Sequence, residues 1–304
     1  IEESKRLFLP SGILREGSSH YHVLLAHNFT TASRIARKHD HPTAEQLEKI
    51  ADRAAAVVPR LSLPGGMPLI GDISPDIPPS VLMDRNALPA QVGPCNLSEL
   101  CADGWLRFDH GPWSGLWHAS NGGWSYMPGH GHQDCGSFEV HFEGTTLFVD
   151  PGRGAYGESG EAALYRSAKM HNTLSIDAKD PYPANKPYFN DVFRRKISGP
   201  SPVFEVRENS VSLTHHGYAR LRGVDSVKRV WLFDDRSLSI SDTVEGSATK
   251  PVGRTLCTTF SVTPEDNALL LEDKSLSLRL SFSFGILVIT ILVLLITKLQ
   301  LQQL

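Results

Sequence analysis

Apolar residues in the first hundred positions recur at intervals that predict helices. Between positions 18 and 38 they recur at three- and four-residue steps, which places them on one face of an amphipathic helix. They are Tyr21, Leu24, Leu25, Phe29, Ala32, Ile35 and Ala36. Thr43 and Gln46 have capping-box spacing at the start of a second, antiparallel helix, which we expect Pro59 to end. The proline- and glycine-rich stretch 61–79 should be a loop or linker.

After Gly104 the pattern changes to short alternating runs, which predict strands. Residues 138–150 alternate around Glu143-Gly144, and residues 227–244 alternate around Asp234-Asp235, as two hairpins would. Further strands are expected at 171–176, 203–206, 211–213 and 276–282. Many short strands with turn signals predict an antiparallel sandwich. The predicted fold class is therefore α+β and multidomain, with helices before a β-sandwich.

Composition narrows the classes of partner. The 304 residues are 40% hydrophobic, which suffices for a large core, and 30 Lys and Arg against 33 Asp and Glu include no long basic run. We therefore expect no nucleic-acid partner. The apolar run 285–297 is shorter than the roughly 20 residues of a membrane span, so no stable span is expected. Three interpretations of this apolar run remain open: a marginal membrane anchor, a buried strand pair or a non-native extension.

A cluster of histidines and acidic residues is the most informative chemical feature. The run PGHGHQD places His130, His132 and Asp134 two apart, so that in an extended segment they project to one face. Asp150 follows the first hairpin, and His171 precedes a predicted strand. Imidazole and carboxylate groups of this kind suit a divalent transition metal. The alternative is that these histidines are ordinary surface or core residues. The cysteines match no zinc ribbon; Cys95 and Cys101 form either a local disulfide or unrelated buried thiols.

Several motifs together resemble one family. PGHGHQDCGSFEV, LFVDPG and YRSAKMHNTLSID, in this order, resemble the C-terminal sheet domain of the heparinase II/III-like polysaccharide lyases. EGSSHYHVLL resembles the segment of their helical toroid that carries a catalytic tyrosine. The resemblance implies a partial α/α toroid with its linker at 1–100, an antiparallel β-sandwich at 104–283, and a polysaccharide cleft between them. It leaves 284–304 as an apolar tail outside the family pattern.

The resemblance also implies roles for individual residues. Tyr21 corresponds to the general acid, often also the base, and His130 to the histidine that either takes the C5 proton or neutralises the uronate. The implied zinc ligands are His132, Asp150 and His171, and the second site tyrosine is Tyr156 or Tyr165. Arg153, Arg166 and Lys169 either bind an acidic sugar or are solvated surface charges. Trp113, Trp117 and Trp124 either stack on sugar rings or pack in the core.

The function implied is β-elimination of a uronate-containing polysaccharide, with Zn²⁺ bound, in the periplasm or at the cell surface. A phenol of lowered pKa would pass a proton between carbon and the departing O4, while nearby donors stabilise the enolate-like charge. Two alternatives stay open: a non-catalytic carbohydrate-binding or exopolysaccharide-assembly protein, and a metal-dependent hydrolase with Asp134 or Glu139 as base. The family's upstream asparagine element has no counterpart in the twenty residues before Tyr21, so we expect weak or no activity from this chain. The oligomeric state is not indicated.

Overall fold

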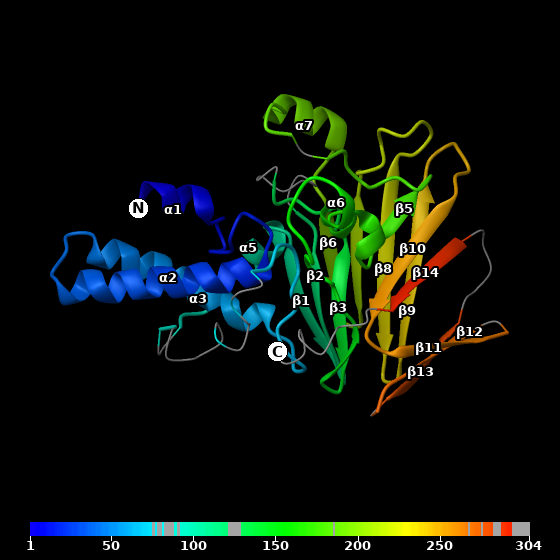
Figure 1. Ribbon diagram of the computed structural model, residues 1–304, viewed down its shortest axis with the longest axis horizontal. Coiled ribbons are helices and arrows are strands. Elements are labelled where there is room, and N and C mark those ends of the chain that lie inside the picture. Colours follow the sequence, from blue (N-terminus) through cyan, green and yellow to red (C-terminus); the bar gives the residue numbers. More distant parts are fainter. Residues whose placement is uncertain are drawn as a thin grey trace.

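The computed structural model describes residues 1–74, 77, 81, 88–89, 92–120, 129–184, 186–266, 268–274, 276–281 and 287–293. Helices come first in the chain and strands dominate the rest (Figure 1). The helices are α1 (Glu2–Leu7), α2 (Ser19–Lys38), α3 (Ala44–Leu61), α5 (Leu97–Ala102), α6 (Gly160–Tyr165), α7 (Asp191–Ser198) and a 3₁₀ turn, η1 (Ala168–Met170). The predicted order of helices before antiparallel sheets is confirmed.

The strands form four sheets. One is β1 (Trp105–His110), β2 (Trp113–His118), β3 (Ser137–Phe142) and β4 (Thr145–Phe148), and another is β6 (Val203–Arg207), β7 (Ser210–His215), β8 (Ser226–Asp234) and β9 (Ser237–Glu245), each in this order. The third is β14 (Leu287–Val293), β10 (Val252–Thr258) and β5 (Leu174–Ile176), and the fourth is β11 (Ser261–Glu265), β12 (Ala268–Glu272) and β13 (Ser277–Ser281). Neighbouring strands are antiparallel except β10 and β14.

Both predicted hairpins are present. β3 turns into β4 through Glu143 and Gly144, whose φ values of 49° and 81° are those of a type I′ turn. β8 turns into β9 with Asp234 paired to Ser237. The expected strand at 171–176 is shorter than predicted, because β5 begins only at Leu174. His171 therefore lies in the loop before the strand.

The helix pair α2 and α3 departs from the predicted pattern in two ways. Pro59 does not end α3, which continues to Leu61. A proline in the last turn removes only one backbone hydrogen bond, so the helix tolerates it there. The buried face of α2 is lined by Val23 and Ala26, which pack with Ala54 of α3, whereas Ile35 of the predicted stripe is 56% exposed. Small residues at this contact allow the two helices to approach closely, and the larger apolar side chains lie to the side.

Aromatic side chains join the two four-stranded sheets. The ring centroid of Trp117 lies 5.7 Å from that of Trp231 and 6.1 Å from that of Phe233. Trp113 and Trp117 are buried core residues, so the core-packing alternative is correct for both; Trp124 lies outside the described residues. Every position of β2 and β3 is buried, because the other face of this sheet is also covered.

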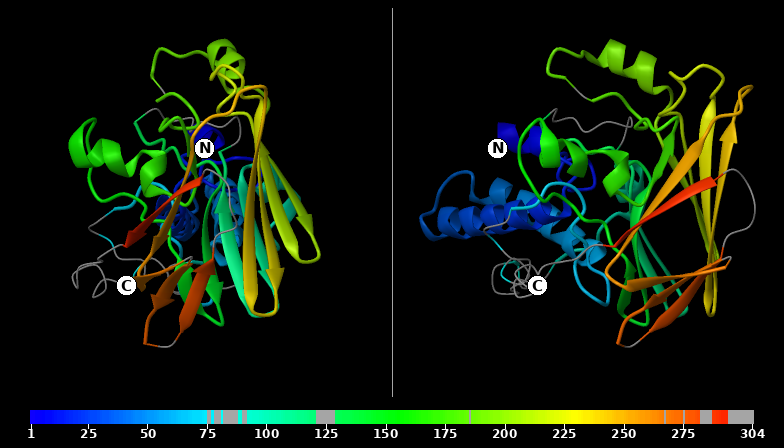
Figure 2. Two further views of the ribbon diagram at one scale, coloured as in Figure 1. Left: turned by 90° about the vertical axis from the view of Figure 1, so that its right-hand side faces the viewer. Right: turned by 45° about the vertical axis from the view of Figure 1, so that its right-hand side comes forward.

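That other face meets the helical part of the chain. Leu116 of β2 and Trp105 of β1 pack in one cluster with Val57 and Leu61 of α3 and with Ile70 of the linker. Figures 1 and 2 show the helices projecting from this side of the sheets. The linker between helices and sheets is thereby fixed against both.

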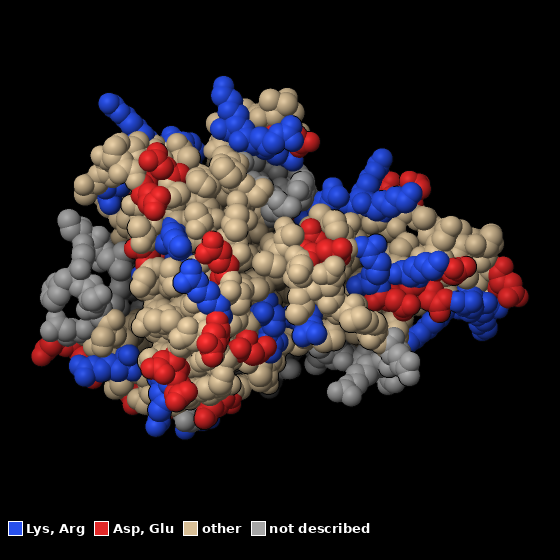
Figure 3. Space-filling view, turned by 180° about the vertical axis from the view of Figure 1, so that it is seen from behind, with Lys and Arg blue, Asp and Glu red and all other residues tan. Residues whose placement is uncertain are grey.

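One cluster of charged side chains joins β8, β9 and β10. The side chain of Asp242 in β9 is only 5% exposed and pairs with both Arg229 and Arg254. On the face seen in Figure 3, basic and acidic side chains are interspersed.

Residues 287–293 form β14, in parallel register with β10, which agrees with the strand interpretation of the apolar run. No described helix is both long and apolar enough to cross a bilayer. All four cysteines are free.

Candidate active site

The first turn of α2 fixes the linker that follows α3. Ser18 caps the helix by accepting a hydrogen bond from the backbone N–H of Tyr21 (2.9 Å), and its hydroxyl donates to the carbonyl of Asp72 (2.5 Å). The backbone N–H of Ser19 donates to the carbonyl of Ile70 (3.0 Å). These bonds tie the linker to the residues that carry Tyr21, so Asp72 is positioned by the same turn.

The loop after β4 presses against the same linker. Gly152 has a φ of +58°, and a Cβ at this position would lie 2.4 Å from the carbonyl oxygen of Leu69. Only glycine fits both the left-handed backbone and this close approach. The sequence Asp150-Pro151-Gly152 thus brings the residues after β4 to the linker, and with them Arg153.

Asp72 lies at the centre of the site. Its fully buried carboxylate accepts hydrogen bonds from Nδ1 of His130 at Oδ2 (2.7 Å) and from Nε2 of His132 at Oδ1 (2.8 Å). Nη1 of Arg153 also donates to Oδ1 (2.7 Å). Burial alone would raise the pKa of Asp72, but the hydrogen bonds from His132 and Arg153 outweigh burial and hold that pKa below its usual value. Asp72 could not be found from the sequence, since an acidic residue in a proline- and glycine-rich linker has no distinctive pattern.

Tyr21 and Tyr156 meet at their hydroxyl groups. The two oxygens are 2.5 Å apart, and the hydroxyl of Tyr156 donates to the carbonyl of Ile73 (2.6 Å). Since Tyr156 has only one proton to donate, Tyr21 must donate to Tyr156. Arg153 lies 4.1 Å from the centroid of the Tyr156 ring, a cation–π contact. Tyr165 instead packs against Gly154, where a Cβ would lie 2.4 Å from the tyrosine ring. This geometry favours Tyr156 over Tyr165 as the second tyrosine.

The pKa of Tyr21 is raised. Burial is the main cause, and the negative charges of Asp72 and Glu16 add to it, while the charge of Arg153 partly offsets the effect. The pKa of Tyr156 is raised as well, again mainly by burial. The expectation of a lowered phenol pKa is therefore wrong for this structure. A phenol that keeps its proton suits the general acid better than the general base.

The three predicted zinc ligands lie close together and are buried. Nδ1 of His171 is 3.0 Å from Oδ2 of Asp150, a carboxylate that also accepts a hydrogen bond from Ser137. The ring centroids of His132 and His171 are 5.2 Å apart. Burial would lower the pKa of His171, but the charge of Asp150 outweighs it and raises that pKa to about 8. Nδ1 of His132 is buried and has no hydrogen-bond partner among the described residues.

These donors fit a transition metal in kind, because two imidazoles and one carboxylate are typical zinc ligands. Nδ1 of His132 and Nε2 of His171 are both buried without a hydrogen-bond partner among the described residues. Their donor atoms are not gathered within 4.8 Å of one another. Among the described residues that tight grouping is found at Glu16, Asp72 and His130. There Arg153 already neutralises Asp72, which makes that grouping a poor cation site. The set His132, Asp150 and His171 stays a prediction.

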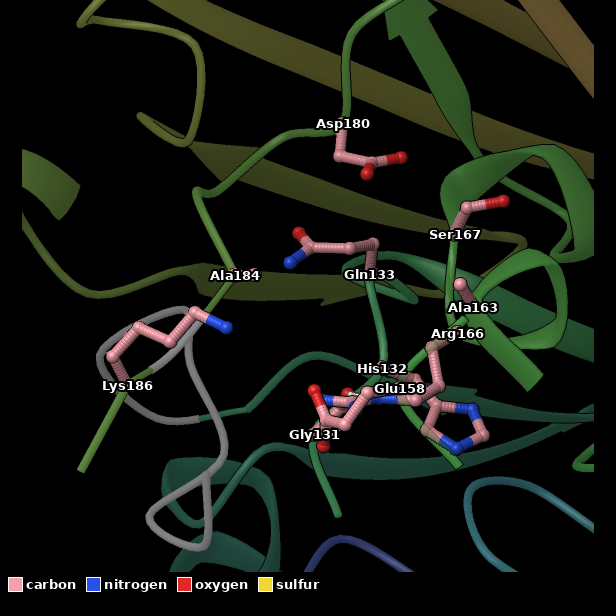
Figure 4. Close-up of a pocket in the computed structure, with 10 residues that line it drawn as sticks. All are labelled: Gly131, His132, Gln133, Glu158, Ala163, Arg166, Ser167, Asp180, Ala184 and Lys186. Atoms are coloured by element: carbon pink, nitrogen blue, oxygen red, sulfur yellow. Dashed lines mark hydrogen bonds and ion pairs between the residues drawn. The ribbon is translucent and has the colours of Figure 1, made fainter. Parts of the chain in front are cut away.

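The predicted substrate-binding cations differ in their surroundings. Arg153 is only 4% exposed and is paired with Asp72, so its charge is not available to a sugar. Arg166 lines a pocket of about 240 Å³ and donates from Nε to the carbonyl of Gly131 (3.0 Å). Lys186 lies on the opposite side of that pocket (Figure 4). Lys169 is exposed on η1. Arg166 and Lys186 are thus the cations best placed for an acidic ligand.

Asp134 and Glu139, the two carboxylates considered as bases for hydrolysis, each contact a histidine. Asp134 is buried and accepts a hydrogen bond from Nδ1 of His118 (3.0 Å). Burial would raise its pKa, but the charge of His118 outweighs burial and lowers it. Glu139 is buried against His141 (2.9 Å), and burial raises its pKa. Both carboxylates are thus held by histidine partners, and this engagement gives no support to the hydrolase alternative.

Comparisons with known proteins agree on one fold. The family model described as heparinase II/III-like, C-terminal, matches residues 96–286. Among solved structures, the heparan sulfate lyase HepC from Pedobacter heparinus aligns with a TM-score of 0.62 and 18% identity, over 90% of this chain and 45% of that one. A heparinase III aligns with a TM-score of 0.62 and 20% identity, over 90% and 47%. This chain thus corresponds to less than half of each enzyme. No curated protein matches the chain.

Proposed function

Because this chain belongs to the heparinase II/III-like family, we propose that it forms part of a polysaccharide lyase that cleaves a uronate-containing polysaccharide by β-elimination. The observation that carries the proposal is the meeting of Tyr21, from a helix, with Tyr156, from a loop of the sheet domain, at 2.5 Å. His130 lies at the same junction and is bound to the linker through Asp72. Side chains able to donate and accept protons therefore converge from both parts of the chain.

Tyr21 is the proposed general acid. Its raised pKa keeps the phenol protonated near neutral pH, and its hydroxyl proton is already directed by the hydrogen bond to Tyr156. On substrate binding the proton would transfer to O4 as the C4–O4 bond breaks. A positioned acid of this kind contributes on the order of 10² to 10⁴ in rate.

His130 is the proposed partner in proton transfer. Its Nδ1 is engaged by Asp72 and, at 3.0 Å, by Glu16, which leaves Nε2 as the nitrogen for the substrate. The side chain is 38% exposed and so accessible to a polymer. The electron pair of the broken C5–H bond forms the C4–C5 double bond as O4 departs, while the C5 proton goes to Nε2.

The charge that develops on the uronate carboxylate requires cations or hydrogen-bond donors. We propose that Arg166 and Lys186 supply positive charge at the neighbouring pocket, which also contains His132. The pocket holds the carboxylates of Glu158 and Asp180 as well, and a uronate would displace the exposed Glu158 from Arg166. Zinc, when bound by His132, Asp150 and His171, would cross-link three loops of the sheet domain.

As for the family's enzymes in general, we propose an acidic polysaccharide as partner and a periplasmic or cell-surface location for the protein. Because one of the similar structures is a heparan sulfate lyase, heparan sulfate is the first polymer to test. Hyaluronan and alginate follow as other uronate polymers.

Product analysis in heavy-oxygen water tests the reaction type. The protein is incubated with heparan sulfate, hyaluronan or alginate, and the products are examined by ultraviolet absorbance and mass spectrometry. Elimination gives an unsaturated uronate that absorbs in the ultraviolet and takes up no oxygen from water. A saturated, oxygen-labelled product would support the hydrolase instead. Binding without any product is expected both of the non-catalytic alternative and of a part of a lyase that has little activity by itself.

A further inference from the structure

The carboxylate of Asp72 accepts hydrogen bonds from more N–H groups than a single salt bridge would provide. Its buried carboxylate accepts from three donors: His130 at Oδ2, and His132 and Arg153 together at Oδ1. A carboxylate only accepts hydrogen bonds, and a guanidinium only donates them. Each imidazole must therefore place a proton on the nitrogen that faces Asp72.

The two histidines face Asp72 with different nitrogens. His130 presents Nδ1, and His132 presents Nε2. In the neutral imidazole the other nitrogen then carries a lone pair. For His130 this is Nε2, and for His132 it is Nδ1, which is buried and has no hydrogen-bond partner among the described residues.

We propose that Asp72 is the positioning residue of this site, a single carboxylate that fixes the tautomers of His130 and His132 in opposite senses. It leaves Nε2 of His130 free to accept a proton and Nδ1 of His132 free as an electron-pair donor to a metal. The roles of these two lone pairs, in accepting a proton and in binding a metal, rest on the proposed lyase function. The tautomers themselves do not depend on that function. Carboxylates commonly orient metal-binding histidines through the second ring nitrogen.

Glu16 is the other carboxylate close enough to His130 to fix its tautomer. Its Oε1 lies 3.0 Å from the same Nδ1, against 2.7 Å for Asp72. Glu16 is also within the electrostatic influence of Arg153. Asp72, in contrast, accepts hydrogen bonds from both histidines and from Arg153. The substitutions Asp72→Asn and Glu16→Gln each replace one carboxylate by an amide of nearly the same shape, so they form a matched pair.

The two variants should behave differently. In Asp72→Asn the amide oxygen must stay at the Oδ1 position, because Arg153 cannot accept a hydrogen bond. The amide NH₂ then faces His130 and donates to Nδ1, so the proton of His130 moves to Nε2. His132 keeps its proton on Nε2. In Glu16→Gln both histidines keep their wild-type tautomers, because Asp72 still accepts from each.

The test is a two-bond ¹H–¹⁵N correlation spectrum of protein labelled at histidine, recorded without metal or substrate at mildly alkaline pH. The signals are assigned by comparison with His130→Gln and His132→Gln. We expect Nδ1–H at His130 and Nε2–H at His132 in the wild type, and inversion of His130 alone in Asp72→Asn. The proposal is overturned if either wild-type tautomer is the opposite one or if His130 is doubly protonated. It is also overturned if Glu16→Gln inverts His130 and Asp72→Asn does not.

Loss of the buried charge can unfold the Asp72→Asn protein, which circular dichroism would show. The wild-type spectrum then decides alone, because each of its two tautomers is specified in advance. Since neither polysaccharide nor zinc is present, a negative lyase assay leaves this result unaffected. An opposite tautomer would likewise overturn the role of Asp72 without removing the lyase proposal.

Discussion

His22 links α2 to two other segments and should make the stability of the fold depend on pH. Its Nδ1 accepts a hydrogen bond from the backbone N–H of Leu14 (3.1 Å), and its Nε2–H donates to the carbonyl of Ala54 (2.9 Å). The side chain is completely buried. Both bonds require the neutral imidazole, because protonation would place a second N–H against that of Leu14.

The magnitude follows from the pKa of His22. Burial lowers it from 6.5 to about 4, although the hydrogen bond to Ala54 acts in the opposite direction. Between these values the unfolded chain binds a proton that the folded protein does not. The stabilisation is therefore complete above pH 6.5 and is lost as the pH falls toward 4. At about 1.4 kcal/mol per pKa unit, the loss amounts to about 3 kcal/mol.

Urea denaturation at a series of pH values, for the wild type and His22→Gln, measures this loss. Glutamine can donate to Ala54 but does not titrate, and it leaves Leu14 without an acceptor at a cost of about 1–3 kcal/mol at every pH. The buried His215, with a pKa lowered to about 3, contributes equally to both proteins and cancels. The wild type should lose about 3 kcal/mol more than the variant between pH 7 and 4. Parallel curves would refute the reasoning.

Three further predictions concern other parts of the molecule. His132→Ala and His171→Ala should each lower the zinc content of protein purified with zinc, measured by atomic emission; unchanged content in both would show the ligand assignment to be wrong. Gly152→Ala should lower the free energy of unfolding by about 1–3 kcal/mol, because of its positive φ and the close approach of Leu69; an unchanged denaturation midpoint would contradict the close contact. Asp242→Asn should destabilise by about 3–5 kcal/mol, since the buried Arg229 and the partly buried Arg254 lose their counter-charge; a loss under 1 kcal/mol would mean that water reaches the cluster.

The fold was predictable where local pattern and tertiary packing agree. The hairpin turns at Glu143-Gly144 and near Asp235 follow from alternation and turn residues. The face of α2 was not predictable, because hydrophobicity alone favours burial of Ile35 over Ala26 and only the packing against α3 selects Ala26. Whether Pro59 ends α3 was not predictable either, because a proline in the last turn of a helix is tolerated and the end of the helix was not known from the sequence.

The site was predictable where a motif carries the chemistry. His132, Asp150 and His171 stand in recognisable motifs and do lie near one another, and Tyr21 does meet Tyr156. Asp72 was missed, because its partners are distant in sequence and only the folded linker brings it to them. The raised phenol pKa was missed for a similar reason: burial and neighbouring charge are tertiary properties.

The central claim is that Tyr21 protonates the leaving oxygen of an elimination reaction. Initial rates of unsaturated product from the best uronate polymer should be compared for the wild type, Tyr21→Phe and Tyr165→Phe, with circular dichroism as a check of folding. We predict a loss of about 10²-fold or more for Tyr21→Phe and a rate within a few-fold of wild type for Tyr165→Phe. Equal rates for the wild type and Tyr21→Phe would contradict the account.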